Sequence, residues 1–216
     1  VYDKCSNIIQ IEGLLRWENP KLGSLQADMF IPLAEKNGLI DDLFSFVLLG
    51  VCQHIKRWRA EGLTVPKMAL NVSRVQLGNA SFADSVQRVL IAQNIDASQL
   101  EFEMTESAIL HNVEQSMSTL KRLRSLGCSL GIDDFGVDYS SMNYLKNLPV
   151  QTLKVDKSYI DQLGTCSHSR LILKAIVAFG KALGLSVIAE GVETEGQLTW
   201  VQNSEVSAIQ GFYMSK

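Results

Sequence analysis

The sequence is poor in residues that mark several common classes of protein. Its 216 residues include only 4 cysteines and 3 histidines. No cysteine belongs to a C-x-x-C pair, which argues against a zinc site or a disulfide scaffold and favours reduced, mostly structural thiols. The histidines, His54, His111 and His168, share no motif, so we expect them to be surface or packing residues.

Excess charge and long apolar runs are also missing. The formal net charge is only -3, which provides no overall attraction for a DNA or RNA duplex or for an anionic membrane. The longest apolar run, residues 44–52, is too short to span a bilayer, and the start of the chain has no signal-peptide pattern. We therefore expect a cytoplasmic domain without membrane contact, with any anchor of a full-length protein in other segments.

What the sequence does contain is a regular alternation of two patterns. Nearly continuous apolar runs, typical of parallel strands buried on both faces, cover residues 8–15, 67–72, 100–104, 129–133, 152–155, 186–189 and 207–210. Apolar residues at helical spacing lie between them, at 41–60, 81–93, 113–126, 170–183 and 195–202. Glycines stand where these helices should stop or turn: Gly38, Gly62, Gly127 and Gly184.

This alternation predicts an α/β fold, a TIM-like (β/α)₈ barrel formed by residues 1–216 as a single domain. The seven predicted strands are one short of a barrel, so a first strand is expected upstream of Val1, where the chain resembles the end of a hairpin. A doubly wound open sheet is the alternative. It would need a Gly-rich first turn, which the sequence lacks.

Polar side chains that can bind metal ions recur at the predicted strand ends. They are Glu12, Asn71, Glu103, Asp133, Asp134 and Glu190, and Lys154 ends a further strand. The C-terminal ends of barrel strands carry the catalytic groups of this fold. A carboxylate beside a buried strand is costly unless a cation or hydrogen bonds offset its desolvation. Oxygen ligands without His or Cys favour Mg²⁺ or Mn²⁺.

The adjacent pair Asp133 and Asp134 is the strongest local indication of metal binding. Two neighbouring carboxylates repel each other unless a cation lies between them. If the first acid bridges, the pair can hold two divalent ions in an arrangement that suits in-line attack at phosphorus. The alternative is a solvated Asp-Asp loop.

Two other segments can be interpreted in two ways. Glu12 and Arg16, four residues apart on one strand face, could bind metal and phosphate respectively, or form a simple ion pair. Asn71 could be a metal ligand or a turn-forming residue.

The same holds for two segments further along the chain. Glu101 and Glu103 share one strand face, while Glu106 either begins a loop or, together with Thr105, begins a helix. Lys154 and Asp156 could position an attacking water or form a structural ion pair.

Taken in order, the motifs of this chain resemble those of the EAL-domain family, the cyclic di-GMP phosphodiesterases. The resemblance covers essentially the whole chain and rests on EGLLRW, FIPLAEKNGLI, NVS, EFEMTES, GIDDFG, YSS-x-x-YLKNLPVQTLKVD, IAEGVET and IQGFYMSK. It implies a TIM-like barrel whose first strand is antiparallel and cut short here. It also implies two Mg²⁺ or Mn²⁺ ions, hydrolysis of cyclic di-GMP to linear pGpG, a homodimer, and sensory or GGDEF-type cyclase domains in the same full-length chain.

The resemblance also implies roles for individual residues. One metal ion would be bound by Glu12, Asn71, Glu103 and Asp133, and the other by Asp133, Asp134 and Glu190. Lys154 would contact the nucleophilic water, and Glu106 would anchor the loop after Asp134. On the substrate side, Arg16 and Gln210 would hold cyclic di-GMP, Leu14 would line a guanine pocket, and Asp156 and Glu193 would support the site.

The chain departs from the family pattern at two places. Gly13 replaces the alanine of the Glu-Ala-Leu motif, a change of one methyl group that we expect to have little chemical effect. Val137 and Asp138 stand where the family has Thr-Gly, and Asp tolerates positive φ less well than Gly. Because the family uses this loop to order the second metal site and the dimer contact, the second departure favours the alternative of a weakened, receptor-like EAL domain.

Overall fold

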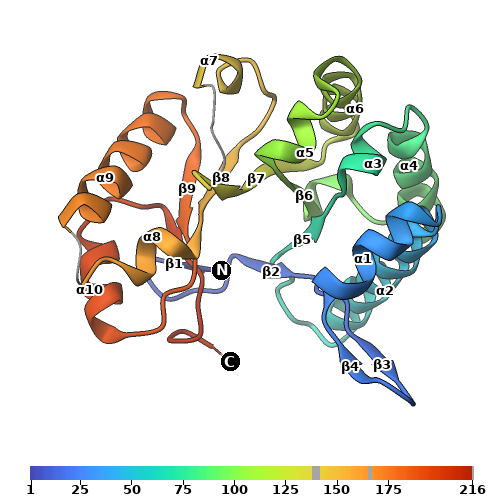
Figure 1. The fold of residues 1–216 in the computed structure, drawn as a ribbon. Helices are drawn as coiled ribbons and strands as arrows, with labels where there is room; N and C mark the ends of the chain where they lie inside the picture. The colour runs from blue at the N-terminus through green and yellow to red at the C-terminus, as the bar shows by residue number, and fades with distance from the viewer. Residues whose placement is uncertain (138–141, 165–166, 216) are drawn as a thin grey trace.

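The computed structural model describes residues 1–137, 142–164 and 167–215, and its central element is an eight-stranded sheet (Figure 1). In sheet order the strands are β1 (Tyr2–Asp3), β10 (Ala208–Ile209), β9 (Ser186–Ala189), β8 (Thr152–Val155), β7 (Ser129–Phe135), β6 (Leu100–Thr105), β5 (Lys67–Asn71) and β2 (Gln10–Glu12). All pairs from β2 to β10 are parallel. The predicted strands are therefore confirmed, within a few residues at their ends.

The first strand, β1, is antiparallel and short, as expected. Tyr2 and Asp3 pair antiparallel with Ile209 and Ala208, and Tyr2 forms a second antiparallel bridge with Ile8, just before β2. This bridge brings the two edges of the sheet together, which gives the nearly closed barrel of eight strands.

Helices surround this sheet (Figure 1). The long ones are α1 (Ala27–Lys36), α2 (Ile40–Ala60), α4 (Phe82–Gln93), α6 (Val113–Leu126), α9 (Ser167–Ala182) and α10 (Glu195–Gln202). The short ones are α3 (Arg74–Leu77), α5 (Glu106–Leu110), α7 (Met142–Leu145) and α8 (Lys157–Asp161), with the 3₁₀ turn η1 (Ala97–Gln99). A separate hairpin, β3 (Trp17–Asn19) and β4 (Gly23–Leu25), projects from the barrel beside α1 (Figure 1).

The five predicted helices all form, and the glycines predicted to end or turn helices adopt left-handed backbone. Gly38, Gly62, Gly127 and Gly184 have φ of 71°, 76°, 102° and 73°. Helix α1 and the hairpin were not predicted, because α1 contains Pro32 and the hairpin strands are only 3 residues long. Such short elements show too little periodicity to be recognised.

Alternation along the strands separates an apolar outer face from a polar barrel interior. On β6, the ring of Phe102 packs outward against Phe44 of α2 and Phe82 of α4, with ring centroids 6.0 and 6.5 Å apart. Glu101 and Glu103 alternate with it and point inward, although both are buried. Packing of the outer face therefore fixes the strand that carries the inner carboxylates.

The cysteines and the lengths of the helices bear on disulfide bonding and on membrane spanning. Cys5, Cys52 and Cys128 are free thiols, and the last two are buried. Cys166 lies outside the described residues. Within the described ranges, no helix combines the length and the apolar character needed to cross a membrane.

Candidate metal centre at the C-terminal end of the barrel

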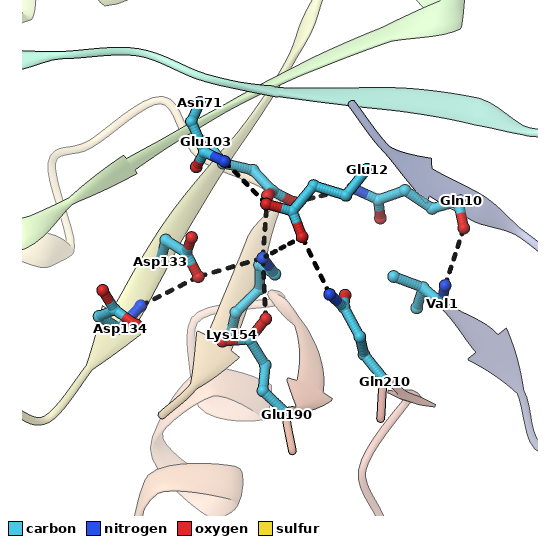
Figure 2. Close-up of polar contacts among 10 residues, drawn as sticks. All are labelled: Val1, Gln10, Glu12, Asn71, Glu103, Asp133, Asp134, Lys154, Glu190 and Gln210. Carbon is cyan, nitrogen blue, oxygen red and sulfur yellow. Dashed lines mark hydrogen bonds and ion pairs between the residues drawn. The ribbon is translucent and has the colours of Figure 1, made fainter. Parts of the chain in front are cut away.

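One lysine lies in the middle of a ring of carboxylates at the C-terminal ends of the strands (Figure 2). The Lys154 Nζ is 2.9 Å from Glu103 Oε2, 2.9 Å from Glu190 Oε1, 3.1 Å from Asp133 Oδ1 and 3.8 Å from Glu12 Oε2. Its side chain is only 1% exposed. These residues come from five segments, β2, β6, β7, β8 and the end of β9. The barrel therefore brings together side chains that lie far apart in the sequence.

The two adjacent aspartates reach the same site because β7 is irregular between them. In a regular strand their side chains would point to opposite faces. The register of β7 against β8 shifts between Ile132 and Phe135, and Asp134 has a left-handed φ of 51°. A bulge of this kind redirects a side chain, and oxygens of Asp133, Asp134 and Glu190 lie within 4.8 Å of one another.

Glu12 is held by two amide side chains. The Asn71 Nδ2 donates to Glu12 Oε1 at 2.7 Å, and the Gln210 Nε2 donates to Glu12 Oε2 at 2.9 Å (Figure 2). The Oε1 atom of Gln210 is buried and has no partner among the described residues. Gln210 thus braces a predicted ligand and has one buried acceptor without a partner among the described residues.

The carboxylates carry more negative charge than one lysine can neutralise. Burial raises the pKa of Glu103 to about 7 despite the opposing effect of Lys154, with Asp133 and Glu12 adding to the rise. Burial likewise raises the pKa of Glu190 against the effect of Lys154. Burial and then the Asp133 charge also raise the pKa of Asp134.

Glu12 and Lys154 are shifted toward their charged forms instead. Burial opposes ionisation of Glu12, but Lys154 and the bonds from Gln210 and Asn71 together lower its pKa. Burial would lower the pKa of Lys154, and the surrounding acids, Glu103 first, raise it far above its ordinary value. Lys154 is therefore a cation in the metal-free protein.

The geometry of the acids fits divalent metal ions. Oxygens of Glu12, Glu103 and Asp133 lie within 4.8 Å of one another, and so do oxygens of Asp133, Asp134 and Glu190. Asp133 belongs to both clusters, in the division that the family resemblance implies for the acids. The donors are all oxygens, which suit hard cations, and the raised pKa values show that additional positive charge would be stabilising.

A cavity of about 660 Å³ opens onto these acids. Eight of the predicted site residues line this cavity: Glu12, Leu14, Arg16, Asp134, Asp156, Glu190, Glu193 and Gln210. Leu14 is 53% exposed, and Arg16 donates to its own neighbour, the Leu15 carbonyl, at 3.0 Å. The predicted alternative of a Glu12–Arg16 ion pair is not found among the described residues. A second, apolar cavity of about 430 Å³ meets the site at Leu14, Asn71 and Glu103.

Asp156 and Glu193 lie at the rim of the larger cavity. Asp156 caps α8 by accepting from the Ser158 N–H at 2.9 Å, and Glu193 pairs with Lys157 at 2.5 Å. The alternative of a Lys154–Asp156 ion pair is not found in the described part of the chain, since the Lys154 ion pairs run to the four acids of the ring.

Glu106 begins a helix, so the prediction that it begins a loop is wrong. Thr105 caps α5 by accepting from the Ala108 N–H at 3.3 Å, and Glu106 is the first residue of that helix. The Glu106 carboxylate is buried and accepts from the Tyr144 hydroxyl of α7 at 3.5 Å. Of the divergent pair, Val137 is exposed, and Asp138 lies outside the described residues.

Sequence reasoning missed Gln10. It is buried on β2, and its Nε2 donates to Glu103 Oε1 at 2.8 Å. The sequence did indicate that Gln10 faces the site, because Gln10 precedes Glu12 by two residues and therefore shares its strand face.

Comparison with known proteins agrees with this fold. A family model described as the EAL domain matches residues 1–216, so the chain belongs to the EAL-domain family. It is similar to the cyclic di-GMP phosphodiesterase NbdA of Pseudomonas aeruginosa, with 41% identity over 207 residues, 96% of this chain and 26% of that protein. It is also 38% identical over 209 residues to the bifunctional diguanylate cyclase/cyclic di-GMP phosphodiesterase MucR of the same organism, covering 97% and 30% respectively. The chain thus spans less than a third of these relatives.

Solved structures give the same result. The cyclic di-GMP complex of the PaMucR phosphodiesterase superposes with a TM-score of 0.94 at 38% identity, covering 100% of this chain and 87% of that one. The FimX EAL domain of Pseudomonas aeruginosa has a TM-score of 0.90 over 100% of this chain and 86% of that one; at 23% identity it supports the fold alone.

Proposed function

We propose that this chain, as a single EAL-type domain, hydrolyses cyclic di-GMP to linear pGpG. The observation that carries the proposal is the pair of acidic clusters sharing Asp133 around Lys154. Membership of the EAL family and the similarity to NbdA and MucR are the reasons for proposing cyclic di-GMP as the substrate.

We assign two Mg²⁺ or Mn²⁺ ions to these clusters. Glu12, Asn71, Glu103 and Asp133 would hold one ion, and Asp133, Asp134 and Glu190 the other. Metal ions bound there would lower the pKa of a water and neutralise charge on the phosphodiester. For Asn71 to use its oxygen in this way, its amide must turn, because its nitrogen now donates to Glu12.

The residues of the chain would position the reactants around this centre. Lys154, a buried lysine paired with the acids of the site, would hold the attacking water by donating to it. Arg16, which has no acidic partner among the described residues, would bind a phosphate, and Leu14 would cover a guanine base. Gln210 would keep Glu12 in place and accept from the substrate with its free Oε1. Asp156 and Glu193 would border the substrate, while Glu106 would brace the segment after β7 through Tyr144.

The wider setting follows from the relatives and is proposed on the same basis. We expect a cytoplasmic homodimer, attached in the full-length chain to sensory or GGDEF-type cyclase domains like the cyclase part named for MucR. Membrane and duplex nucleic acid are not expected partners of this domain.

The direct test is a turnover assay with purified protein, cyclic di-GMP and either Mg²⁺ or Mn²⁺, with pGpG detected by chromatography. Glu12→Gln keeps the side-chain shape and removes the charge. It should reduce turnover by more than the roughly 10–100-fold typical of losing an outer partner of a metal ligand. Glu114→Gln, on the exposed surface of α6, is the matched control and should retain full activity. A folded wild-type protein that yields no pGpG with either metal contradicts the proposal.

The divergent loop supports a second candidate, a receptor that binds cyclic di-GMP without cleaving it. Val137 replaces a family threonine at an exposed position next to Gly136, whose φ is 97°. Calorimetry with cyclic di-GMP in the presence of a chelator distinguishes the two functions. Tight metal-free binding together with absent turnover would favour the receptor.

A further inference from the structure

Gln10 contacts the most deeply buried carboxylate of the metal centre. Glu103 is 0% exposed and Gln10 is 5% exposed. The Gln10 amide donates to Glu103 Oε1 at 2.8 Å, while the Lys154 ammonium is 2.9 Å from the other oxygen, Oε2 (Figure 2). The two oxygens of Glu103 therefore have different environments: one faces a neutral donor, and the other faces the centre of the site.

The contrast with Glu101 shows that this arrangement is specific. Glu101 lies two residues earlier on the same inward face of β6 and is also buried, but its Oε1 has no partner among the described residues. Its other oxygen lies 3.5 Å from Lys67. A buried acceptor without a partner is costly, so the donor from Gln10 both stabilises Glu103 and fixes the orientation of its carboxylate.

A neutral donor also suits this position better than a charged one. Lys154 already compensates part of the negative charge, and another ammonium beside Glu103 would compete with a metal ion for the same acids. The amide of Gln10 adds no charge. It is held by β2, in which Gln10 pairs with Lys67 of β5, and it lies on the same strand face as Glu12.

We propose that Gln10 is a positioning residue that makes Glu103 a monodentate ligand. By occupying Oε1, it leaves Oε2 as the oxygen that faces the metal, and it thereby sets the metal affinity of the cluster formed by Glu12, Glu103 and Asp133. This inference rests on the metal centre of the proposed function, but it does not depend on the identity of the substrate.

The test is calorimetry of Mn²⁺ binding to the whole chain without nucleotide. Gln10→Met keeps the length of the side chain and removes the donor. We expect its Mn²⁺ Kd to rise roughly 10–100-fold, as for other outer partners of metal ligands. Turnover of cyclic di-GMP at limiting Mn²⁺ should fall and should recover when Mn²⁺ is raised, which a merely structural defect would not do.

Gln76→Met is a matched control. Gln76 is also buried, and its amide donates to a carboxylate, that of Asp41, at 3.3 Å, but it contacts none of the acids of the metal centre. The control should lose stability and keep the wild-type Kd for Mn²⁺. If Gln10→Met fails to fold, Gln10→Asn is the second variant. Its side chain is one methylene shorter, which moves the amide donor away from Glu103, and it should show the same rise in the Kd for Mn²⁺.

Two outcomes would overturn the inference: an unchanged Kd in the Gln10 variants, or a loss of activity that excess Mn²⁺ does not restore. Failure of the proposed function would give a different experimental result from failure of this inference. A wild-type protein that binds Mn²⁺ in a Gln10-dependent way but leaves cyclic di-GMP intact would sink the phosphodiesterase proposal and support the role of Gln10.

Discussion

At the scale of single residues, the site depends on buried charges that stabilise one another only as a group. Lys154 alone in the barrel would be expensive to bury, and so would each of its acidic neighbours. Removing Lys154 would leave the surrounding acids without their shared cation, and breaking a buried ion pair in this way typically costs about 3–5 kcal/mol. The ring therefore restricts substitution most strongly at Lys154.

Gly13 offers a substitution beside this ring that introduces no charge. Its φ is not in the left-handed region, so alanine fits the backbone. An added Cβ would meet the end of the buried Leu70 side chain at 3.0 Å and the Val51 side chain at 3.4 Å, so Leu70 must shift by a few tenths of an ångström. Restricting the unfolded chain should outweigh that adjustment. We expect Gly13→Ala to raise the free energy of unfolding by roughly 0.4–1 kcal/mol, measured by urea denaturation, with turnover unchanged.

Gly211→Ala is the contrasting variant for this prediction. A Cβ at Gly211 would overlap the backbone of Val192, which cannot rotate away as a side chain can. It should lower the free energy of unfolding. Equal destabilisation by both alanine substitutions would show that Leu70 does not yield and that the expected gain at Gly13 is absent.

At the scale of elements, the most consequential feature is the irregularity in β7. The bulge and the left-handed Asp134 bring two consecutive carboxylates to one site. A left-handed conformation at a non-glycine residue is strained, and such strain persists where the surroundings impose it. Burial and then the Asp133 charge raise the pKa of Asp134, so repulsion between the two carboxylates adds to this strain.

Substitutions at Asp134 separate its charge from its backbone conformation. Asparagine also tolerates left-handed φ, so Asp134→Asn should keep or slightly raise the melting temperature while weakening Mn²⁺ binding and turnover. Asp134→Val lacks the same charge but is β-branched, and it should in addition lose roughly 1–3 kcal/mol of stability. Thermal melts and Mn²⁺ calorimetry on both variants provide the measurement. Equal stability of the two variants would mean that the conformation of Asp134 imposes no strain.

How far the sequence predicts this architecture depends on the length and regularity of each element. Helix α6 and strands β8 and β9 form over the predicted residues, because their apolar patterns are uninterrupted. The residues of the first barrel strand were not located, because two residues carry no pattern, and the helix start at Glu106 stayed one of two interpretations because a helix of 5 residues shows no periodicity.

The site was predicted more completely than the contacts that hold it. Acids at strand ends are visible in the sequence because the C-terminal ends of parallel strands converge. The bulge at Asp134 and the bonding partners of Gln10 and Gln210 are not visible, because they depend on register and on residues far away in the chain; for Gln10 the sequence shows only the strand face that it shares with Glu12. Gln210 and Glu12, for example, are separated by 198 positions.

At the scale of the whole molecule, the barrel concentrates negative charge at one end although the net charge is only -3. Glu12, Glu103, Asp133 and Glu190 converge on a single ammonium, and Asp134 lies beside them. The metal-free protein must therefore either tolerate unneutralised carboxylates or keep some of them protonated. The pKa of about 7 for Glu103 and the raised pKa of Glu190 indicate protonation near neutral pH.

This balance links stability to pH. In the unfolded chain, Glu103 titrates near 4.5, whereas in the folded, metal-free protein it titrates near 7. The folded state thus binds more protons between these values, and its stability falls as pH rises through that window. Glu12 has a lowered pKa and acts in the opposite sense, but only at lower pH, where its folded and unfolded forms differ in charge.

We therefore expect the melting temperature of the metal-free protein, measured in a chelator, to decrease between about pH 5 and pH 8. Mn²⁺ binds the deprotonated acids, so its stabilising effect should grow over the same range and reach about 2.7 kcal/mol when Mn²⁺ is at 100 times its Kd. Glu103→Gln removes one of the titrating groups and should flatten the decrease, which ties the effect to this carboxylate. A metal-free melting temperature that rises across this window would show that the acids around Lys154 are already ionised, and that the ring needs no further cation.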